Sequence, residues 1–152
     1  MDLLLKAERF CAYQERCRFE VEKKLRERKA KPNEISKILS SLEEDGYLND
    51  ERYTKNFASG KFRIKRWGKN KIRAELRMKK ISEDLISNAL DGIDEEEYFK
   101  TIQHLINKKS REVKSQNSKD KTRKILMFLL SRGFESELIW RVLKKDPETS
   151  SG

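Results

Sequence analysis

Glycine, proline and cysteine are all scarce in this chain of 152 residues, which contains six Gly, two Pro and two Cys. No alternating run of β-branched residues occurs, and few turn-forming residues are available to connect strands. The two cysteines, Cys11 and Cys17, are six residues apart, a spacing that matches no common zinc or redox motif. These shortages disfavour β-structure and cysteine-based sites, and they predict an all-α chain.

Motifs for catalysis and for membrane insertion are missing as well. The single histidine, His104, lies between core-spaced residues of a predicted helix, where we expect a structural role. The sequence contains no glycine-rich phosphate loop, no metal-ligand spacing and no serine nucleophile elbow. No segment approaches the roughly 18 apolar residues of a membrane span, and the amino terminus does not resemble a secretory signal. We therefore expect a cytoplasmic, monomeric protein that is not an enzyme and uses no cofactor or metal.

The chain does contain one apolar pattern that occurs three times. Seven apolar positions of the second copy recur 53 residues later in the third copy, and six positions of the first copy recur 51 residues later in the second. The first copy consists of Val21, Leu25, Ala30, Ile35, Ile38 and Leu39; the second of Ile72, Leu76, Ile81, Leu85, Ile86, Ala89 and Leu90; the third of Ile125, Leu129, Phe134, Leu138, Ile139, Val142 and Leu143. A repeat of about fifty residues is typical of helical units that stack on their neighbours.

Each copy is predicted to contain three helices, so we expect an elongated tandem array of three three-helix repeats. The predicted repeats cover residues 1–48, 49–93 and 94–146, and residues 147–152 are predicted to be a flexible tail. Residues 125–130 are six apolar residues in succession, which predicts a helix enclosed between neighbours.

The first helix of the middle repeat is predicted from Tyr53, Phe57, Ile64 and Trp67, whose spacings of four, seven and three place them on one side of a helix. The polar residues ahead of this stripe, 49–51, suit the start of that helix, because their oxygens can accept its free amide hydrogens. Capping explains these carboxylates more simply than metal binding does. Gly46 is predicted to end the preceding helix in the left-handed conformation.

Positive charge is concentrated on the middle repeat. Residues 51–93 contain 12 basic and 5 acidic side chains, whereas residues 1–50 contain 11 of each. Between positions 61 and 80 there are ten basic residues and one acid, Glu75. The predicted partner-binding residues are Lys61, Arg63, Lys65, Arg66, Lys69, Lys71, Arg73, Arg77 and Lys80. A helix that keeps so many repelling like charges indicates an anionic partner, although an ordinary solvated face is the alternative.

Helical spacing predicts one cationic ridge within this set, formed by Lys69, Arg73, Arg77 and Lys80. Two aromatic residues, Phe62 and Trp67, are interleaved with the basic run and could stack on nucleic-acid bases. Packing in the core is the alternative for both, and it is the favoured reading for Trp67. The residue types on the ridge suit phosphate or carboxylate contacts better than base reading.

Two segments resemble a known family. Residues 44–53, which read EDGYLNDERY, are similar to the GYLND-R-[FY] signature of the RecX family, bacterial modulators of the RecA recombinase. Residues 67–81, which read WGKNKIRAELRMKKI, resemble the second block of that family, a Gly followed by a helix with a Glu-Leu pair and a Lys-Gly-Ile ending. The chain departs from the family at Lys80, which replaces the glycine of that ending, and at Cys17, in the usual Arg-Ser-Arg entry; the third repeat keeps Gly133 at the place equivalent to Lys80.

The resemblance implies a fold of three tandem three-helix units and a partner, the RecA filament on single-stranded DNA. Members of the family are expected to lie in the helical groove of that filament and to restrain ATP hydrolysis, strand exchange and the co-protease activity that triggers the SOS response. A DNA-binding protein built from helix-turn-helix-like repeats that acts without a protein partner is the alternative.

Overall fold

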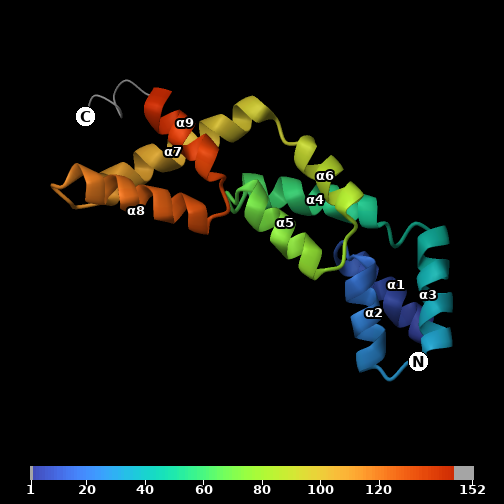
Figure 1. Cartoon of the computed structure of the whole chain (residues 1–152). Coiled ribbons are helices and arrows are strands. Elements are labelled where there is room, and N and C mark those ends of the chain that lie inside the picture. The colour runs from blue at the N-terminus through green and yellow to red at the C-terminus, as the bar shows by residue number, and fades with distance from the viewer. Residues whose placement is uncertain (1, 146–152) are drawn as a thin grey trace. The chain divides into compact units, whose positions relative to one another are not determined.

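A computed structural model describes residues 2–145 of the chain, and the predicted tail at 147–152 lies outside the described residues. Over those residues the chain forms α-helices and no strands (Figure 1). The helices of the first predicted repeat are α1 (Leu3–Tyr13), α2 (Arg18–Glu27) and α3 (Pro32–Glu44). The next three are α4 (Asp50–Arg63), α5 (Lys69–Met78) and α6 (Glu83–Asp91). The last three are α7 (Glu95–Glu112), α8 (Ser118–Ser131) and α9 (Ser136–Lys145). No described helix is long and apolar enough to cross a membrane.

The first three helices pack against one another around a shared apolar core. This core contains repeated positions from α2 and α3 together with residues of α1, namely Ala7, Cys11, Val21, Leu25, Ile35, Ile38, Leu39, Leu42 and Leu48. Apolar residues three and four apart share one side of each helix, so three such sides can close on one another. Five of the six repeated positions of the first copy are therefore buried in the core, and the sixth, Ala30, packs against it partly buried.

The last three helices form an equivalent group, in which α7, α8 and α9 each pack against the other two (Figure 1). Ile125, Leu129, Phe134 and Ile139 are at most 4% exposed. The prediction that residues 125–130 are enclosed was wrong, because only Ile125 and Leu129 are buried while Met127 is 56% exposed. Position along the helix, and not the length of an apolar run, decides which side chains face the core.

The chain divides into two compact units, and the middle repeat contributes to both. The first unit consists of Met1–Phe57 and Leu76–Asn88, and the second of Ala58–Glu75 and Ala89–Gly152. Each unit therefore contains one junction between successive repeats. In the first unit the first repeat packs with part of the second, and in the second unit the rest of the second repeat packs with the third. The predicted repeat boundaries remain predictions.

The turn between the second and third helices has the same conformation in all three repeats. Lys29, Lys80 and Gly133, which occupy equivalent positions, have φ values of 63°, 56° and 94°. Glycine adopts this left-handed region most easily, yet lysine is found there twice. The predicted left-handed Gly46 is confirmed, with φ of 79°. Lys80 consequently lies beyond the end of α5 at Met78, so the ridge predicted on that helix has three helical members and a fourth in the turn.

The predicted apolar stripe of the first middle helix needs a correction. Helix α4 ends at Arg63, so Ile64 and Trp67 lie beyond it, and Ile64 is 80% exposed. The buried positions of α4 instead include Tyr53, Ala58 and Phe62. The spacing from 53 to 67 fits a helical period, but the helix stops before the pattern does, and the chain reaches the left-handed Arg66 with φ of 56°.

Candidate functional site

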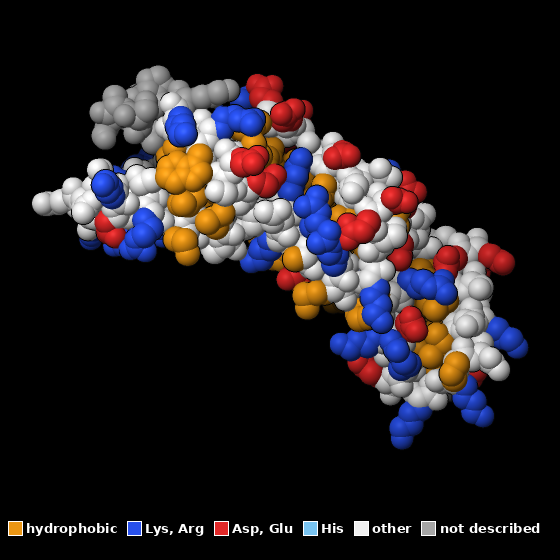
Figure 2. Space-filling view, in the orientation of Figure 1, with side chains coloured by type: hydrophobic (Ala, Val, Ile, Leu, Met, Phe, Trp, Pro, Cys, Tyr) orange, Lys and Arg blue, Asp and Glu red, His pale blue; other side chains and the backbone are white. Residues whose placement is uncertain are grey.

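Seven of the nine predicted partner-binding residues lie in one segment of the second compact unit. They are Lys61, Arg63, Lys65, Arg66, Lys69, Lys71 and Arg73, and they span the end of α4, the turn after it and the first half of α5. The other two, Arg77 and Lys80, belong to the part of the chain assigned to the first unit. In Figure 2, Lys and Arg side chains lie over α5. We call the seven residues of the second unit the cationic segment.

Two ammonium groups of the cationic segment lie over the same indole ring. The Nζ atoms of Lys61 and Lys71 are 4.9 and 4.6 Å from the centroid of Trp67. The ring is half-buried, so the prediction that Trp67 packs in the core was only partly right. A cation over an indole is held by electrostatic attraction to the ring face. Trp67 therefore fixes the directions of two long side chains that would otherwise be mobile.

The amino terminus of α5 is held by the third repeat. The amide of Gly68 donates to the carbonyl oxygen of Arg132 at 2.7 Å, and the amide of Asn70 donates to that of Gly133 at 2.9 Å. The amide of Lys69 donates to the Tyr98 hydroxyl at 2.9 Å. The first amides of a helix have no partner inside the helix. Here tertiary contacts supply the partners, and they set the position of the cations on α5.

Two glycines allow this close approach. A Cβ atom added at Gly68 would lie 2.3 Å from the carbonyl carbon of Gly133, and one added at Gly133 would lie 2.4 Å from the Cβ of Lys71. These distances are far below van der Waals contact, so neither position has room for a side chain. Gly133 is therefore needed both for the left-handed turn of the third repeat and for the close contact of that turn with the start of α5.

Tyr98 connects α7, the start of α5 and the third-repeat turn. Its ring packs between Phe62 and Phe134, with centroid distances of 5.5 and 5.4 Å. Its hydroxyl forms a hydrogen bond with the Glu135 carboxylate as well as accepting from Lys69. Burial and the neighbouring Glu135 raise the pKa of Tyr98, so the phenol stays protonated and neutral. Phe62 is 3% exposed, which removes it from the predicted base-stacking residues.

Ion pairs within the protein neutralise some of the predicted cations, whereas other predicted cations have no carboxylate partner in the described residues. Arg63 lies 3.5 Å from Glu97, and Arg77 donates two hydrogen bonds to Glu83. Both pairs are exposed and therefore weak. Within residues 2–145, no carboxylate oxygen lies within 4.0 Å of the charged atoms of Lys65, Arg66, Lys69, Lys71, Arg73 or Lys80. The cationic segment thus keeps a net positive charge available for an anion.

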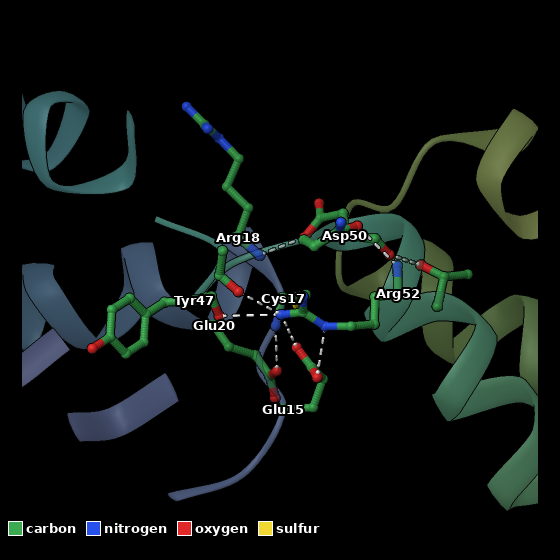
Figure 3. A network of polar contacts seen from close by, with 10 residues as sticks. Glu15, Cys17, Arg18, Glu20, Tyr47, Asp50 and Arg52 are labelled. Atoms are coloured by element: carbon green, nitrogen blue, oxygen red, sulfur yellow. Dashed lines mark hydrogen bonds and ion pairs between the residues drawn. The ribbon is translucent and has the colours of Figure 1, made fainter. Parts of the chain in front are cut away.

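The first junction uses equivalent residues, with different partners (Figure 3). The amide of Arg18, at the start of α2, donates to the Asp50 carboxylate at 2.7 Å. Tyr53, which like Tyr98 is the fourth residue after the cap of its helix, is buried, and burial together with the neighbouring Glu20 raises its pKa. The residues predicted to cap α4 thus act on two different helices. Asn49 caps α4 by accepting from the amide of Arg52, whereas Asp50 accepts from the first amide of α2.

Arg52 is a structural residue that the sequence reasoning did not single out. Its guanidinium donates to both carboxylate oxygens of Glu15, at 2.9 and 2.8 Å, and to the carbonyl oxygen of Gly46 at 3.1 Å (Figure 3). It thereby ties the start of α4 to the segment before α2. The sequence could have indicated Arg52, because it is the arginine of the GYLND-R-[FY] segment. No sequence pattern indicates its partner Glu15.

Comparisons with known proteins also identify three-helix domains in this chain. A family model described as "RecX, second three-helix domain" matches residues 49–90, and one described as "RecX, third three-helix domain" matches residues 95–143. A regulatory protein RecX of Chlorobaculum tepidum is 30% identical over 127 residues, covering 84% of this chain and 77% of that protein. The chain belongs to the RecX family.

Other RecX proteins match over much of this chain but are longer. The regulatory protein RecX of Clostridium perfringens is 32% identical over 129 residues, covering 83% of this chain and 59% of the relative. That of Bacillus cytotoxicus is 29% identical over 135 residues, covering 89% of this chain and 50% of the relative. The chain thus spans half to three fifths of the length of these two relatives.

Solved RecX structures have the same fold. A crystal structure of RecX from Lactobacillus salivarius matches with a TM-score of 0.87 at 24% identity, covering 99% of this chain and 96% of that one. Together with the family domains, this likeness confirms the predicted all-α repeat fold.

Proposed function

We propose that this protein is a non-enzymatic regulator of the RecA recombinase. In this proposal it binds as a monomer, in the cytoplasm, in the groove of the filament that RecA forms on single-stranded DNA. There it restrains ATP hydrolysis, strand exchange and the SOS co-protease activity. Membership of the RecX family supports a regulatory role, and relatives carry the name regulatory protein RecX.

The observation that carries the proposal for the site is the unneutralised part of the cationic segment. Five of its side chains, Lys65, Arg66, Lys69, Lys71 and Arg73, have no carboxylate within 4.0 Å in the described part of the chain. An anionic surface brought close to them gains attraction without breaking an existing ion pair. The fixed start of α5 and the Trp67 ring hold part of this set in place before binding, which lowers the entropy cost of association.

Charge reversal at three of these residues tests the proposal. The variant K65E/R66E/R73E changes the net charge by −6 and keeps Lys61 and Lys71, whose ammonium groups lie over Trp67. We expect it to abolish the inhibition of DNA-dependent ATP hydrolysis by the recombinase. The control K23E/K37E/K108E has the same change in charge at three exposed lysines of α2, α3 and α7, and it should inhibit like the natural sequence.

Helical circular dichroism and thermal unfolding must first show that both variants fold. Undiminished inhibition by K65E/R66E/R73E would remove the cationic segment from the mechanism. Equal loss in the control would mean that net charge alone is responsible.

A stand-alone DNA-binding role is the second candidate, and the half-buried Trp67 beside two lysines favours it. An unpaired base could stack on the indole only once Lys61 and Lys71 leave the ring face, and phosphate would draw these lysines away from it. Binding to bare single-stranded DNA and to recombinase-coated DNA separates the two roles. Tight binding to bare DNA that the recombinase does not strengthen would support the second.

A further inference from the structure

The helices α1 and α2 border an apolar groove that the cationic segment does not include. Its volume is about 340 Å³, and its floor is formed by Leu3, Ala7, Phe10, Val21 and Leu25. This volume is within the range of about 300–1,000 Å³ that is usual for ligand pockets. Figure 2 shows exposed hydrophobic side chains over the α1–α3 part of the molecule, with Lys and Arg and some Asp and Glu side chains around them.

The rim of the groove carries one sign of charge. Lys6 and Arg9 of α1, Lys24 of α2 and Arg28, the cap residue that follows α2, line the groove, and no aspartate or glutamate of the described residues does. In the described residues none of these four cations has a carboxylate within 4.0 Å. The pocket between α7 and α9 is different, because Glu95 and Glu96 line it together with Lys100 and Arg141. The pocket that Lys119, Arg123 and Trp140 line also has no acid in its described lining, but its Arg123 is already paired with Asp120.

Like charges at these spacings repel. Lys6 and Arg9 are three residues apart on α1, and Lys24 is four residues from Arg28, the cap residue of α2, so each pair lies on one side of its helix. Such pairs destabilise a helix by a few tenths of a kcal/mol each. An occupant with an apolar face and flanking negative charges would cover the floor and relieve this repulsion.

We propose that the α1–α2 groove binds an acidic amphipathic helix of a partner protein. Leucine or phenylalanine side chains of that helix fill the floor, and its glutamates or aspartates contact the four rim cations. A groove between two helices has no sheet edge to pair with an extended strand, so a helix is the peptide form that fits. With 11 residues, α1 is about 16 Å long, which matches anchors at positions i, i+3 or i+4, and i+7.

Single-stranded DNA suits this groove less well than a peptide does. Stacking of bases needs an open aromatic face, and among the described lining residues Phe10 is the only aromatic one. The Arg16 guanidinium already lies 3.9 Å from the Phe10 centroid, and the Lys24 ammonium lies 5.5 Å from it. A base would have to displace these cations.

The groove is independent of the proposed recombinase-regulating surface. Its residues lie between positions 3 and 28, outside the segments 49–90 and 95–143 that the family models match. Failure of one proposal therefore leaves the other intact, because the variants that test them share no residue of either site.

A designed peptide provides the probe. A fluorescein-labelled 16-residue helix with Leu at four i, i+3 or i+4 positions and Glu on either side is titrated with the full chain and followed by anisotropy. We expect saturable binding, whereas a peptide of the same composition in scrambled order should bind at least about tenfold more weakly. In ¹⁵N spectra of the chain, the shifted amides should belong to α1 and α2.

Charge reversal on the rim supplies the second test. K24E/R28E is expected to weaken binding of the designed peptide about tenfold or more. K23E/K37E is the matched control, with the same change in net charge at two exposed lysines of the same compact unit, and it should bind within about twofold of the natural sequence.

Three results would overturn the proposal. The first is equal binding of the scrambled peptide, and the second is equal weakening in the control variant. The third is that the natural occupant differs: a 15-nucleotide oligo-dT displaces the peptide in competition, or sedimentation shows self-association that K24E/R28E abolishes. Oligo-dT displacement would assign the groove to DNA, and self-association would assign it to a second copy of the chain.

Discussion

At the scale of single residues, one backbone position shows how the same conformation can have different causes. Lys29, Lys80 and Gly133 are equivalent, and all three are left-handed. Lysine tolerates this conformation at a cost of the order of 1 kcal/mol, so φ alone does not require glycine. Gly133 differs because a Cβ there would lie 2.4 Å from Lys71. The glycine is therefore explained by a contact with another repeat.

Substitution of Gly133 by alanine tests this explanation. We expect Gly133→Ala to lower the free energy of unfolding by about 2–4 kcal/mol, since backbone strain and a steric clash add. Gly46→Ala is the control, because φ there is also positive but nothing lies within 4 Å of the added Cβ. It should lose only about 1 kcal/mol. Urea denaturation measures both, and equal losses would contradict the proposed contact.

The Glu20 carboxylate predicts an acid-sensitive first junction. Burial opposes its ionisation, but the Cys17 amide at 3.0 Å and the Lys79 ammonium at 3.2 Å outweigh burial and lower its pKa below the usual 4.5. A group with a lowered folded-state pKa stabilises the protein above its unfolded-state value and loses that contribution as the pH falls through the folded-state value.

The direction of this pH dependence can be checked by measuring the free energy of unfolding of Glu20→Gln between pH 7 and pH 3. The variant should be less stable at pH 7, and the gap between it and the natural sequence should narrow below about pH 4.5. Glu27→Gln, at an exposed position of the same helix, is the control and should keep the natural pH profile. A gap that stays constant with pH would show that the charge of Glu20 is not involved.

At the scale of elements, both junctions cap the second helix of one repeat with residues of the next. Asp50 accepts from the amide of Arg18 at the start of α2, and Tyr98 accepts from the amide of Lys69 at the start of α5. A capping residue adjacent in sequence is the usual solution. Here a distant residue binds the first amide of each helix, in addition to the local contact between the Cys17 amide and Glu20 at α2, which couples formation of each helix to docking of the following repeat.

Removal of the Tyr98 hydroxyl tests that coupling. Tyr98→Phe keeps the stacked ring but leaves the Lys69 amide and the Glu135 carboxylate without their shared partner, so we expect a loss of about 1–3 kcal/mol in the free energy of unfolding. Tyr13→Phe, at a residue that is 82% exposed, should change stability by less than about 0.5 kcal/mol. Thermal or urea unfolding distinguishes them, and no loss in Tyr98→Phe would show that water replaces the hydroxyl.

At the scale of the whole molecule, the proposed function implies a salt dependence. If the five unpaired cations of the cationic segment each neutralise one phosphate, the logarithm of the DNA-dependent binding constant should fall with the logarithm of salt concentration with a slope of about −3.5 to −4.5. K65E/R66E/R73E should reduce the magnitude of this slope by at least about two. Fluorescence titration between 50 and 300 mM salt measures it, and an unchanged slope in the variant would mean that these side chains do not contact phosphate.

Much of the fold could be predicted from the sequence. The three copies of one apolar spacing predict three sets of helices, and most of their positions, such as Val21, Ile72 and Leu129, are buried. This succeeds because the helical period and the exclusion of apolar side chains from water are local and general. The charge of the middle repeat is likewise a property of composition, so the cationic segment could be identified from residue types alone.

Only the tertiary structure decided which residues position that segment. Nothing near Gly68 in the sequence indicates that its amide is bound by Arg132, or that Tyr98 and Gly133 receive the next two amides. The sequence likewise does not indicate that Arg77 forms an ion pair with Glu83, whereas Arg73 has no carboxylate within 4.0 Å in the described residues. Side-chain periodicity reports which face of a helix is apolar, whereas capping and ion pairing depend on which distant groups come within about 3 Å after the repeats pack.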